Sequence, residues 1–188
     1  MSETDQRPRD GLTVGVVVAP EGTEEIEFSE SKRSLGDAGA SVEVLSSDSG
    51  EAETVDDDLD WSESHEVDAT FAEVSTDDYD ALVIPGGTVG ADTLRANDEA
   101  VGLVGDLLAD DKPVASICHG PWVLVEADAV EGRTLTSYPS LQTDVRNAGG
   151  EWVDEEVVAD DGLVTSRKPD DLSAFTEAMV ETFAAESS

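Results

Sequence analysis

The sequence predicts an α/β fold with a mainly parallel central β-sheet and helices on both of its faces. Three runs, at 12–19, 81–85 and 113–117, are dominated by Val, Ile, Leu and Ala. Short runs that are apolar on both faces are typical of buried parallel strands. Segments with helical spacing separate these runs, and such βαβ alternation builds a parallel sheet with a layer of helices on each side.

The remaining elements follow from local patterns along the chain. The last helix shows its pattern most clearly, because Leu172, Phe175, Met179 and Phe183 recur on one helical face. In chain order we expect a helix at 24–38, a strand at 41–45, helices at 99–109 and 121–128, two short strands around a helix at 141–148, a strand at 157–165 and a helix at 171–185.

The length of 188 residues indicates one domain, which we place at 12–186 after a flexible polar tail at 1–11. Residues 46–66 are acidic and rich in Ser, and they predict either a long loop or a short, exposed hairpin. No stretch resembles a signal peptide or reaches membrane-spanning length, so no membrane partner is expected. The single cysteine, Cys118, excludes an internal disulfide, and together these features predict a reducing, cytoplasmic setting.

The charge balance is extreme, since 45 acidic residues stand against 10 basic ones and the formal net charge is −35. Self-repulsion of this size destabilises a compact chain in dilute buffer. Because the Debye length falls to about 3 Å at molar salt, the charge predicts a protein adapted to a salt-rich cytoplasm. Disorder is the competing interpretation, and the regular apolar runs argue against it. A nucleic-acid partner is not expected, because the sequence lacks clustered Lys and Arg.

Cys118 lies where a predicted buried strand meets a turn of small residues, Cys118-His-Gly-Pro121. Functional residues of parallel sheets lie at the carboxyl ends of the strands, and Gly86-Gly87 follows another predicted strand at that same edge. The start of the next helix would favour a thiolate and offer backbone N–H groups to an oxyanion. We therefore expect an exposed nucleophile, with His119 as its base or charge partner. The alternative is a buried structural cysteine beside a histidine that only packs at the helix start.

Several motifs connect this site with a known family. Ala-Ser-Ile-Cys-His-Gly-Pro at 115–121 resembles the nucleophile elbow of the PfpI-type intracellular cysteine peptidases. The similarity continues through the segments at 79–87, 132–139, 147–154 and 165–172 and covers nearly everything from Leu12 to Phe183. These peptidases share a superfamily with the parkinsonism-associated deglycase. The resemblance therefore implies a three-layer α/β/α sandwich of the flavodoxin-like, class I glutamine amidotransferase-like type.

The resemblance also implies roles for individual residues. Cys118 would be the nucleophile, and His119 its neighbour in a triad. The backbone N–H groups of His119 and Gly87 would form the oxyanion hole. Glu27 matches the carboxylate that contacts the cysteine, and Asp92 matches an acid that reaches the histidine from a neighbouring subunit. The pocket residues would be Glu24, Gly86 and Tyr138, together with Trp122, which departs from the family pattern and would narrow the site or add an aromatic wall.

No cofactor is implied, and no metal site is expected from one cysteine and two histidines, of which His65 lies in the acidic segment. The expected assembly is a homo-oligomer, either a dimer or a hexamer. A carboxylate beside a thiolate is repulsive, so the Glu27–Cys118 pair is stable only if one proton stays on it. Glu27 is therefore expected to have a raised pKa and to donate a hydrogen bond. The alternative is a solvated glutamate among many.

Two classes of function fit these residues. The first is a cysteine-dependent enzyme that acts on carbonyl carbon, either by peptide hydrolysis or by glyoxalase or deglycase chemistry on methylglyoxal and its protein adducts. The aldehyde reaction is favoured, because no extended substrate channel is evident in the sequence. The second is a redox-sensing or chaperone-like stress protein in which Cys118 is oxidised without turnover. Amidotransferase chemistry is disfavoured, because no histidine follows His119.

Overall fold

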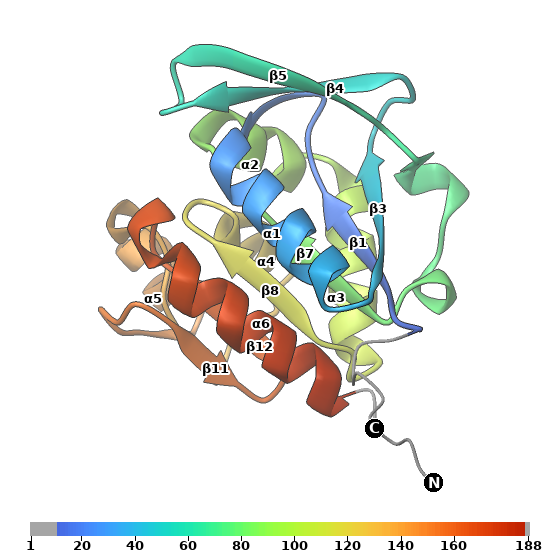
Figure 1. The fold of residues 1–188 in the computed structure, drawn as a ribbon. Coiled ribbons are helices and arrows are strands. Elements are labelled where there is room, and N and C mark those ends of the chain that lie inside the picture. The colour runs from blue at the N-terminus through green and yellow to red at the C-terminus, as the bar shows by residue number, and fades with distance from the viewer. Residues whose placement is uncertain (1–10, 187–188) are drawn as a thin grey trace, which may run out of the picture.

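The structure is a computed structural model that describes residues 11–186, and it confirms a three-layer α/β/α sandwich (Figure 1). The central sheet has seven strands in the order β11-β12-β8-β7-β1-β3-β6. Only β11 pairs antiparallel with its neighbour among these strands. The predicted tail at 1–11 lies, apart from Gly11, outside the described residues.

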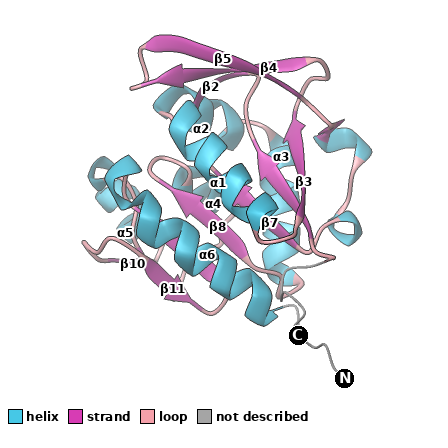
Figure 2. Ribbon diagram, viewed as in Figure 1, coloured by secondary structure: helices cyan, strands magenta, loops and turns pink. Residues whose placement is uncertain are grey.

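The helices and strands have the following bounds (Figure 2). The central sheet contains β1 (Thr13–Val17), β3 (Ser41–Ser46), β6 (Ala69–Thr70), β7 (Ala81–Ile84), β8 (Val114–Ile117), β11 (Val158–Asp160) and β12 (Leu163–Ser166). A three-stranded sheet contains β2 (Glu21–Glu24), β4 (Glu51–Asp56) and β5 (Asp60–Glu66), and a two-stranded one contains β9 (Thr134–Leu135) and β10 (Glu151–Trp152). The α-helices are α1 (Glu25–Asp37), α2 (Thr88–Arg95), α3 (Asp98–Ala109), α4 (Pro121–Glu126), α5 (Gln142–Asn147) and α6 (Leu172–Glu186). Short 3₁₀ turns lie at Phe71–Glu73, Thr76–Asp78, Pro139–Leu141 and Pro169–Asp171.

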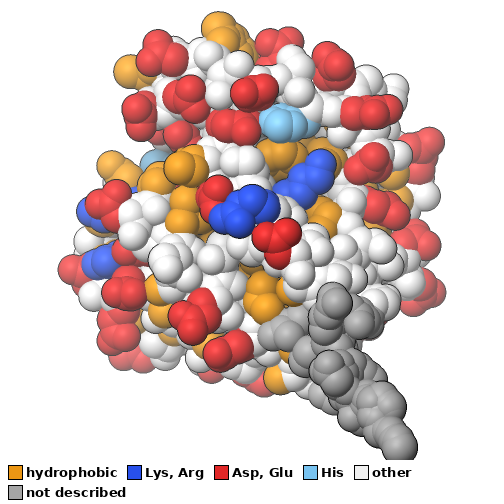
Figure 3. Space-filling view, viewed as in Figure 1, with side chains coloured by type: hydrophobic (Ala, Val, Ile, Leu, Met, Phe, Trp, Pro, Cys, Tyr) orange, Lys and Arg blue, Asp and Glu red, His pale blue; other side chains and the backbone are white. Residues whose placement is uncertain are grey.

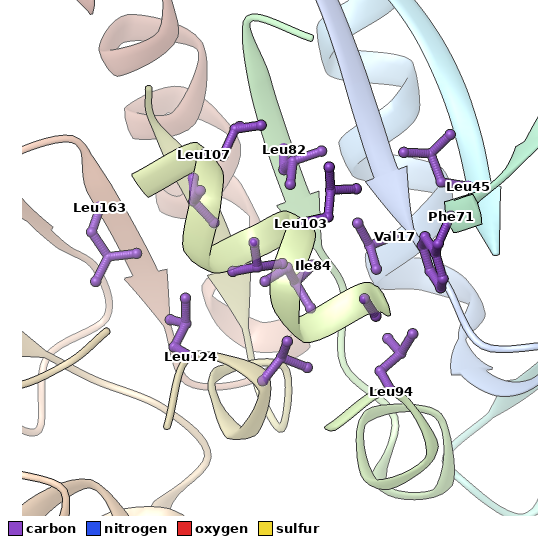
Figure 4. Close-up of a cluster of buried hydrophobic side chains, with 14 of the residues drawn as sticks. Val17, Leu45, Phe71, Leu82, Ile84, Leu94, Leu103, Leu107, Leu124 and Leu163 are labelled. Atoms are coloured by element: carbon purple, nitrogen blue, oxygen red, sulfur yellow. The ribbon is translucent and has the colours of Figure 1, made fainter. Parts of the chain in front are cut away.

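The central strands are apolar on both faces because each face supports its own core. Along β1, Val14 and Val16 belong to a buried cluster that includes side chains of α1 and α6. Val17 points to the opposite face and joins a second cluster with side chains of α2, α3 and α4 (Figure 4). Successive side chains of a strand point to opposite faces, so burial on both sides removes the polar alternation of an exposed sheet.

Most elements lie where the sequence predicted them, but one predicted strand is divided in two and the short edge strand β6 was missed. The segment at 157–165 is not one strand, because it contains the antiparallel pair β11 and β12. Asp161 and Gly162 have φ values of 51° and 85°, a left-handed pair that turns the chain back on itself. The sequence analysis also missed β2 and α2, which flank the site described below.

The acidic segment at 46–66 forms the hairpin β4–β5, as the second of the two predicted alternatives had it. Most side chains of β5 are exposed, and acidic side chains are spread over much of the molecular face in Figure 3. This hairpin pairs with β2 next to the start of α1, so its turn lies near the carboxyl end of β1. Within residues 11–186, no helix is both long enough and apolar enough to cross a bilayer.

Candidate active site

Cys118 occupies a sharp turn between β8 and α4. Its φ of 66° lies in the left-handed region, where a non-glycine residue is strained. The turn is held from both sides, because the Cys118 N–H donates to Ser166 O at 3.0 Å and Cys118 O accepts from Tyr138 N at 2.8 Å. A strained residue between strand and helix is the geometry of a nucleophile elbow. The expectation of an exposed thiol is wrong, since Cys118 is only 7% exposed.

Glu27 lies in the first turn of α1 and is fully buried. Its Oε1 accepts a hydrogen bond from the Gly86 N–H at 2.7 Å. Its Oε2 is buried and has no hydrogen-bond partner within the part of the chain that the structure describes. Burial raises the pKa of Glu27 to about 8, with a further contribution from the charge of Glu24. The expected rise in the Glu27 pKa is therefore confirmed, and the carboxyl holds its proton at neutral pH.

Gly86 lets the Glu27 carboxyl and the Cys118 side chain approach each other. A Cβ atom at position 86 would lie 2.6 Å from Glu27 Oε1 and 2.7 Å from Cys118 Cβ. Real Cβ atoms do not tolerate such distances, so only glycine fits between the two side chains. Gly87 follows with a φ of 95°, another conformation that favours glycine.

The Cys118 thiol lies in an environment with opposing influences on its ionisation. Burial raises the pKa of the thiol most strongly, and the charge of Glu27 raises it further. The backbone N–H groups of Gly87 and His119 donate to the sulfur and lower the thiol pKa in part. Because the net direction is upward, the sequence expectation of a readily ionised thiol is wrong. A base must accept the proton during reaction.

His119 is placed to be that base. Its Nδ1 lies 3.2 Å from Cys118 Sγ. The ring stacks on Tyr138 with 4.6 Å between centroids and meets the edge of Trp122 at 5.2 Å. Burial lowers the pKa of His119, so the ring is neutral at pH 7 and able to accept a proton.

The remaining predicted pocket and triad residues divide into those beside the sulfur and those away from it. Tyr138 and Trp122 flank His119, and Trp122 is fixed by its indole N–H bond to Asp144 Oδ2 at 2.9 Å. Asp92 lies away from His119 within one chain. Its carboxylate pairs with Arg95 at 3.2 Å and remains 63% exposed.

Glu24 contacts the β4–β5 hairpin. It accepts the backbone N–H groups of Asp57 and Asp58 at 2.7 and 3.1 Å. Burial raises the pKa of Glu24, and these two hydrogen bonds oppose that rise. Glu24 was expected to line the pocket, and its carboxylate holds the β4–β5 turn in place through these two hydrogen bonds.

Two residues at the site were not identified from the sequence. The Thr88 hydroxyl lies 3.4 Å from His119 Nε2 and donates to Asp58 Oδ2 at 3.0 Å. Asp58 lies in the turn of an acidic hairpin, where every neighbouring aspartate looks alike in sequence. Residues 11–186 contain no group of three or more His, Cys, Asp or Glu arranged to hold a metal ion.

Comparison with known proteins agrees with the fold described above. The profile of the DJ-1/PfpI family matches residues 13–182. The chain belongs to the DJ-1/PfpI family. Deglycase PfpI of Pyrococcus furiosus is 46% identical over 118 residues, which are 63% of this chain and 70% of that protein.

Two further family members show the range of names within it. A candidate cysteine protease of Bacillus subtilis, YraA, is 38% identical over 152 residues, which are 81% of this chain and 87% of that protein. The crystal structure of Drosophila melanogaster DJ-1beta is 30% identical, with a TM-score of 0.82, over 92% of this chain and 90% of that chain. DJ-1/PfpI relatives thus include proteins named for deglycase and for protease activity.

Proposed function

We propose that this chain is a cysteine-dependent enzyme that acts on reactive carbonyl carbon. The favoured substrate class is a small dicarbonyl such as methylglyoxal, together with the adducts that it leaves on proteins. The observation that carries the proposal is the convergence of the buried Glu27 carboxyl and the Cys118 side chain on Gly86. A protonated acid beside a nucleophile suits addition to an aldehyde, because the developing oxyanion needs a proton as the sulfur attacks.

The first step is addition of the thiol to the aldehyde. Cys118 Sγ forms a bond to the carbonyl carbon while the thiol proton passes to His119 Nδ1, 3.2 Å away. Because Glu27 Oε1 accepts from Gly86, we assign the carboxyl proton to Oε2, and the Glu27 side chain also interacts with that of Cys118. That proton moves to the carbonyl oxygen and completes a hemithioacetal. The backbone N–H groups of Gly87 and His119 donate to the sulfur, which supports their expected role as donors to the developing oxyanion.

The second step moves hydrogen within the adduct. The Glu27 carboxylate takes the C–H proton of the hemithioacetal carbon, and the His119 imidazolium protonates the neighbouring carbonyl oxygen. Glu27 then gives its proton to the neighbouring carbon and recovers one from the hemithioacetal hydroxyl. One carbon is oxidised to a thioester and the other is reduced to an alcohol, so no external oxidant is needed. Water releases a hydroxy acid and restores the thiol.

Peptide hydrolysis would use the same nucleophile through an acyl-enzyme, so both substrates belong in one experiment. We expect the wild type at molar salt to consume methylglyoxal and the Cys118→Ser variant to lose all activity. Glu27→Gln should lose about 100-fold or more, because it can neither give nor take the proton. Glu177→Gln makes the same substitution on the exposed face of α6 and should act like the wild type.

Four outcomes decide between the candidate functions. Consumption of methylglyoxal that exceeds casein cleavage supports the aldehyde reaction, and the reverse supports a peptidase. Activity that survives in Cys118→Ser overturns both. No turnover by the wild type, together with stoichiometric oxidation of its thiol by peroxide, identifies a redox-sensing protein instead.

We also propose that the chain works as a homo-oligomer in which Asp92 serves a neighbouring subunit. Its carboxylate is exposed and has only Arg95 as an ion-pair partner among the described residues, which suits a role across an interface. Light scattering at working salt should give a mass of two or six chains. A monomeric mass with full activity of Asp92→Asn would contradict this role.

A further inference from the structure

A chain of hydrogen bonds leads from the β4–β5 hairpin to the proposed nucleophile. Asp58 accepts two bonds from Thr88, with Oδ1 at 2.7 Å from the backbone N–H and Oδ2 at 3.0 Å from the hydroxyl. The same hydroxyl lies 3.4 Å from His119 Nε2, and His119 Nδ1 lies 3.2 Å from Cys118 Sγ. Four side chains from three separate parts of the fold are therefore connected in series.

The donors and acceptors in this series can point in only one direction. The carboxylate form of Asp58 has no proton to give, so the Thr88 hydroxyl must donate to it. That hydroxyl has a single hydrogen and therefore faces His119 Nε2 with a lone pair. His119 Nε2 must then carry the ring hydrogen, which leaves Nδ1 free to accept the Cys118 proton.

The turn that carries Asp58 is held in place rather than free. Asp57 and Asp58 have φ values of 53° and 66°, a conformation that Asp tolerates better than most residues. Buried Glu24 accepts both of their backbone N–H groups, and Glu24 directly precedes the helix that carries Glu27. The hairpin is thereby fixed to the same helix start as the acid beside the sulfur.

We propose that Asp58 is a positioning residue that acts through Thr88 to hold His119 in the tautomer able to accept the Cys118 proton. The proposal rests on the proposed function and adds to it an acid supplied by the chain itself. In this arrangement the orientation of His119 depends on no neighbouring subunit, in contrast to the role expected of Asp92. The β4–β5 hairpin is therefore part of the active site.

Several titratable groups face His119 and Cys118. The effect of Asp58 on the pH dependence of Cys118 reactivity must be separated from the effects of these groups. Asp58 opposes the burial that lowers the His119 pKa, and it is the one charged residue whose effect on His119 is resolved in the described part of the chain. The titratable or charged groups around the pair are Glu27 on α1, Glu24 at the end of β2, Asp58 on the hairpin, Tyr138 after β9 and, beyond Trp122, Arg95 with Asp92 on α2.

The most informative variant is Asp58→Asn. It keeps the bond from the Thr88 backbone N–H and reverses the direction of the bond with the Thr88 hydroxyl. The Asn oxygen must face the Thr88 N–H, so its amide N–H faces the Thr88 hydroxyl. The hydroxyl then donates to His119 Nε2, and the ring hydrogen moves to Nδ1, where it blocks proton transfer from Cys118. Thr88→Val removes the hydroxyl that connects Asp58 with His119 but keeps the backbone N–H bond to Asp58. Thr88→Ser supplies a hydroxyl at the same position and should retain the connection. Asp57→Asn removes a charge in the same turn and keeps the backbone N–H bond to Glu24, so it is the matched charge control.

Two measurements report on Cys118 and His119 directly and do not require catalytic turnover. The single cysteine allows its alkylation by iodoacetamide to be measured across pH, and ¹⁵N chemical shifts report the tautomer of His119. Asp58→Asn and Thr88→Val should each slow alkylation at pH 7 by about 10-fold or more. Asp58→Asn should also move the ring hydrogen to Nδ1, while Thr88→Ser and Asp57→Asn behave as the wild type.

An unchanged tautomer and an unchanged alkylation profile in folded Asp58→Asn and Thr88→Val overturn the proposal. If Asp58→Asn fails to fold, Thr88→Val alone decides, because it keeps the bond that fastens the turn. The effects should persist on dilution below the assembly concentration, and an effect found only in the oligomer also overturns the proposal. A tautomer change without methylglyoxal turnover by the wild type would instead count against the proposed function alone.

Discussion

Replacing Glu27 by Gln should make the protein more stable, even though it removes a proposed catalytic group. Glu27 is fully buried, and its pKa rises from 4.5 to about 8 on folding. Between these pH values the folded protein holds a proton that the unfolded chain releases. The stability that this proton provides is complete below pH 4.5 and is lost as pH rises through 8.

The size of the effect follows from the same two pKa values. Each tenfold change in proton affinity is worth about 1.4 kcal/mol, so ionisation of Glu27 costs the wild type about 4 kcal/mol between pH 5 and pH 9. Gln mimics the protonated acid and does not titrate. The free energy of unfolding of Glu27→Gln should therefore gain about 4 kcal/mol on that of the wild type over this range.

Denaturant unfolding at fixed molar salt, repeated from pH 5 to pH 9, measures the difference. The same pair of proteins in a Cys118→Ser background removes the thiol from the titration. Glu177→Gln, on the exposed face of α6, should run parallel to the wild type at every pH. Parallel profiles for Glu27→Gln and the wild type would refute the buried, protonated acid.

Two further predictions concern packing and charge. Gly86→Ala places a Cβ atom 2.6 Å from Glu27 Oε1 and should cost about 1–3 kcal/mol of unfolding free energy together with most of the activity. The control is Gly102→Ala in α3, where a Cβ meets nothing within 4 Å, and it should raise the free energy of unfolding by about 0.5–1 kcal/mol. Equal melting temperatures of the two variants would contradict the close approach at Gly86. Because the net charge is −35, the free energy of unfolding should rise when KCl is increased from 0.1 to 2 M, and a fall over that range would argue against salt adaptation.

The sequence predicted the architecture because the signals for the central strands are local. Apolar runs bounded by Gly, Pro and Asp located β1, β7 and β8, and the motif at 115–121 located the elbow. The helix α2 was missed because Thr88–Arg95 is short and begins directly after Gly86-Gly87, where the pattern indicates only a turn. The strand β2 was missed because its sequence, Glu-Gly-Thr-Glu, has no strand preference, and pairing with β4 creates it.

Within the site, the residue types were predictable and their environment was not. Cys118 was identified from its place at the end of a predicted strand and Glu27 from the family resemblance, and the structure brings both side chains to Gly86. The Cys118 turn is held in part by Tyr138, whose backbone N–H donates to Cys118 O from a separate loop. Asp58 could not be selected from the sequence, because its proposed role depends on a turn geometry that the pairing of β4 with β2 and β5 produces.

The most direct test is whether substrate and an alkylating reagent compete for the single thiol. Rates of iodoacetamide labelling of Cys118 in the wild type should fall as methylglyoxal is added, and this protection should saturate over the concentration range that saturates turnover. Labelling that proceeds at an unchanged rate while methylglyoxal is consumed would contradict attack by the buried sulfur.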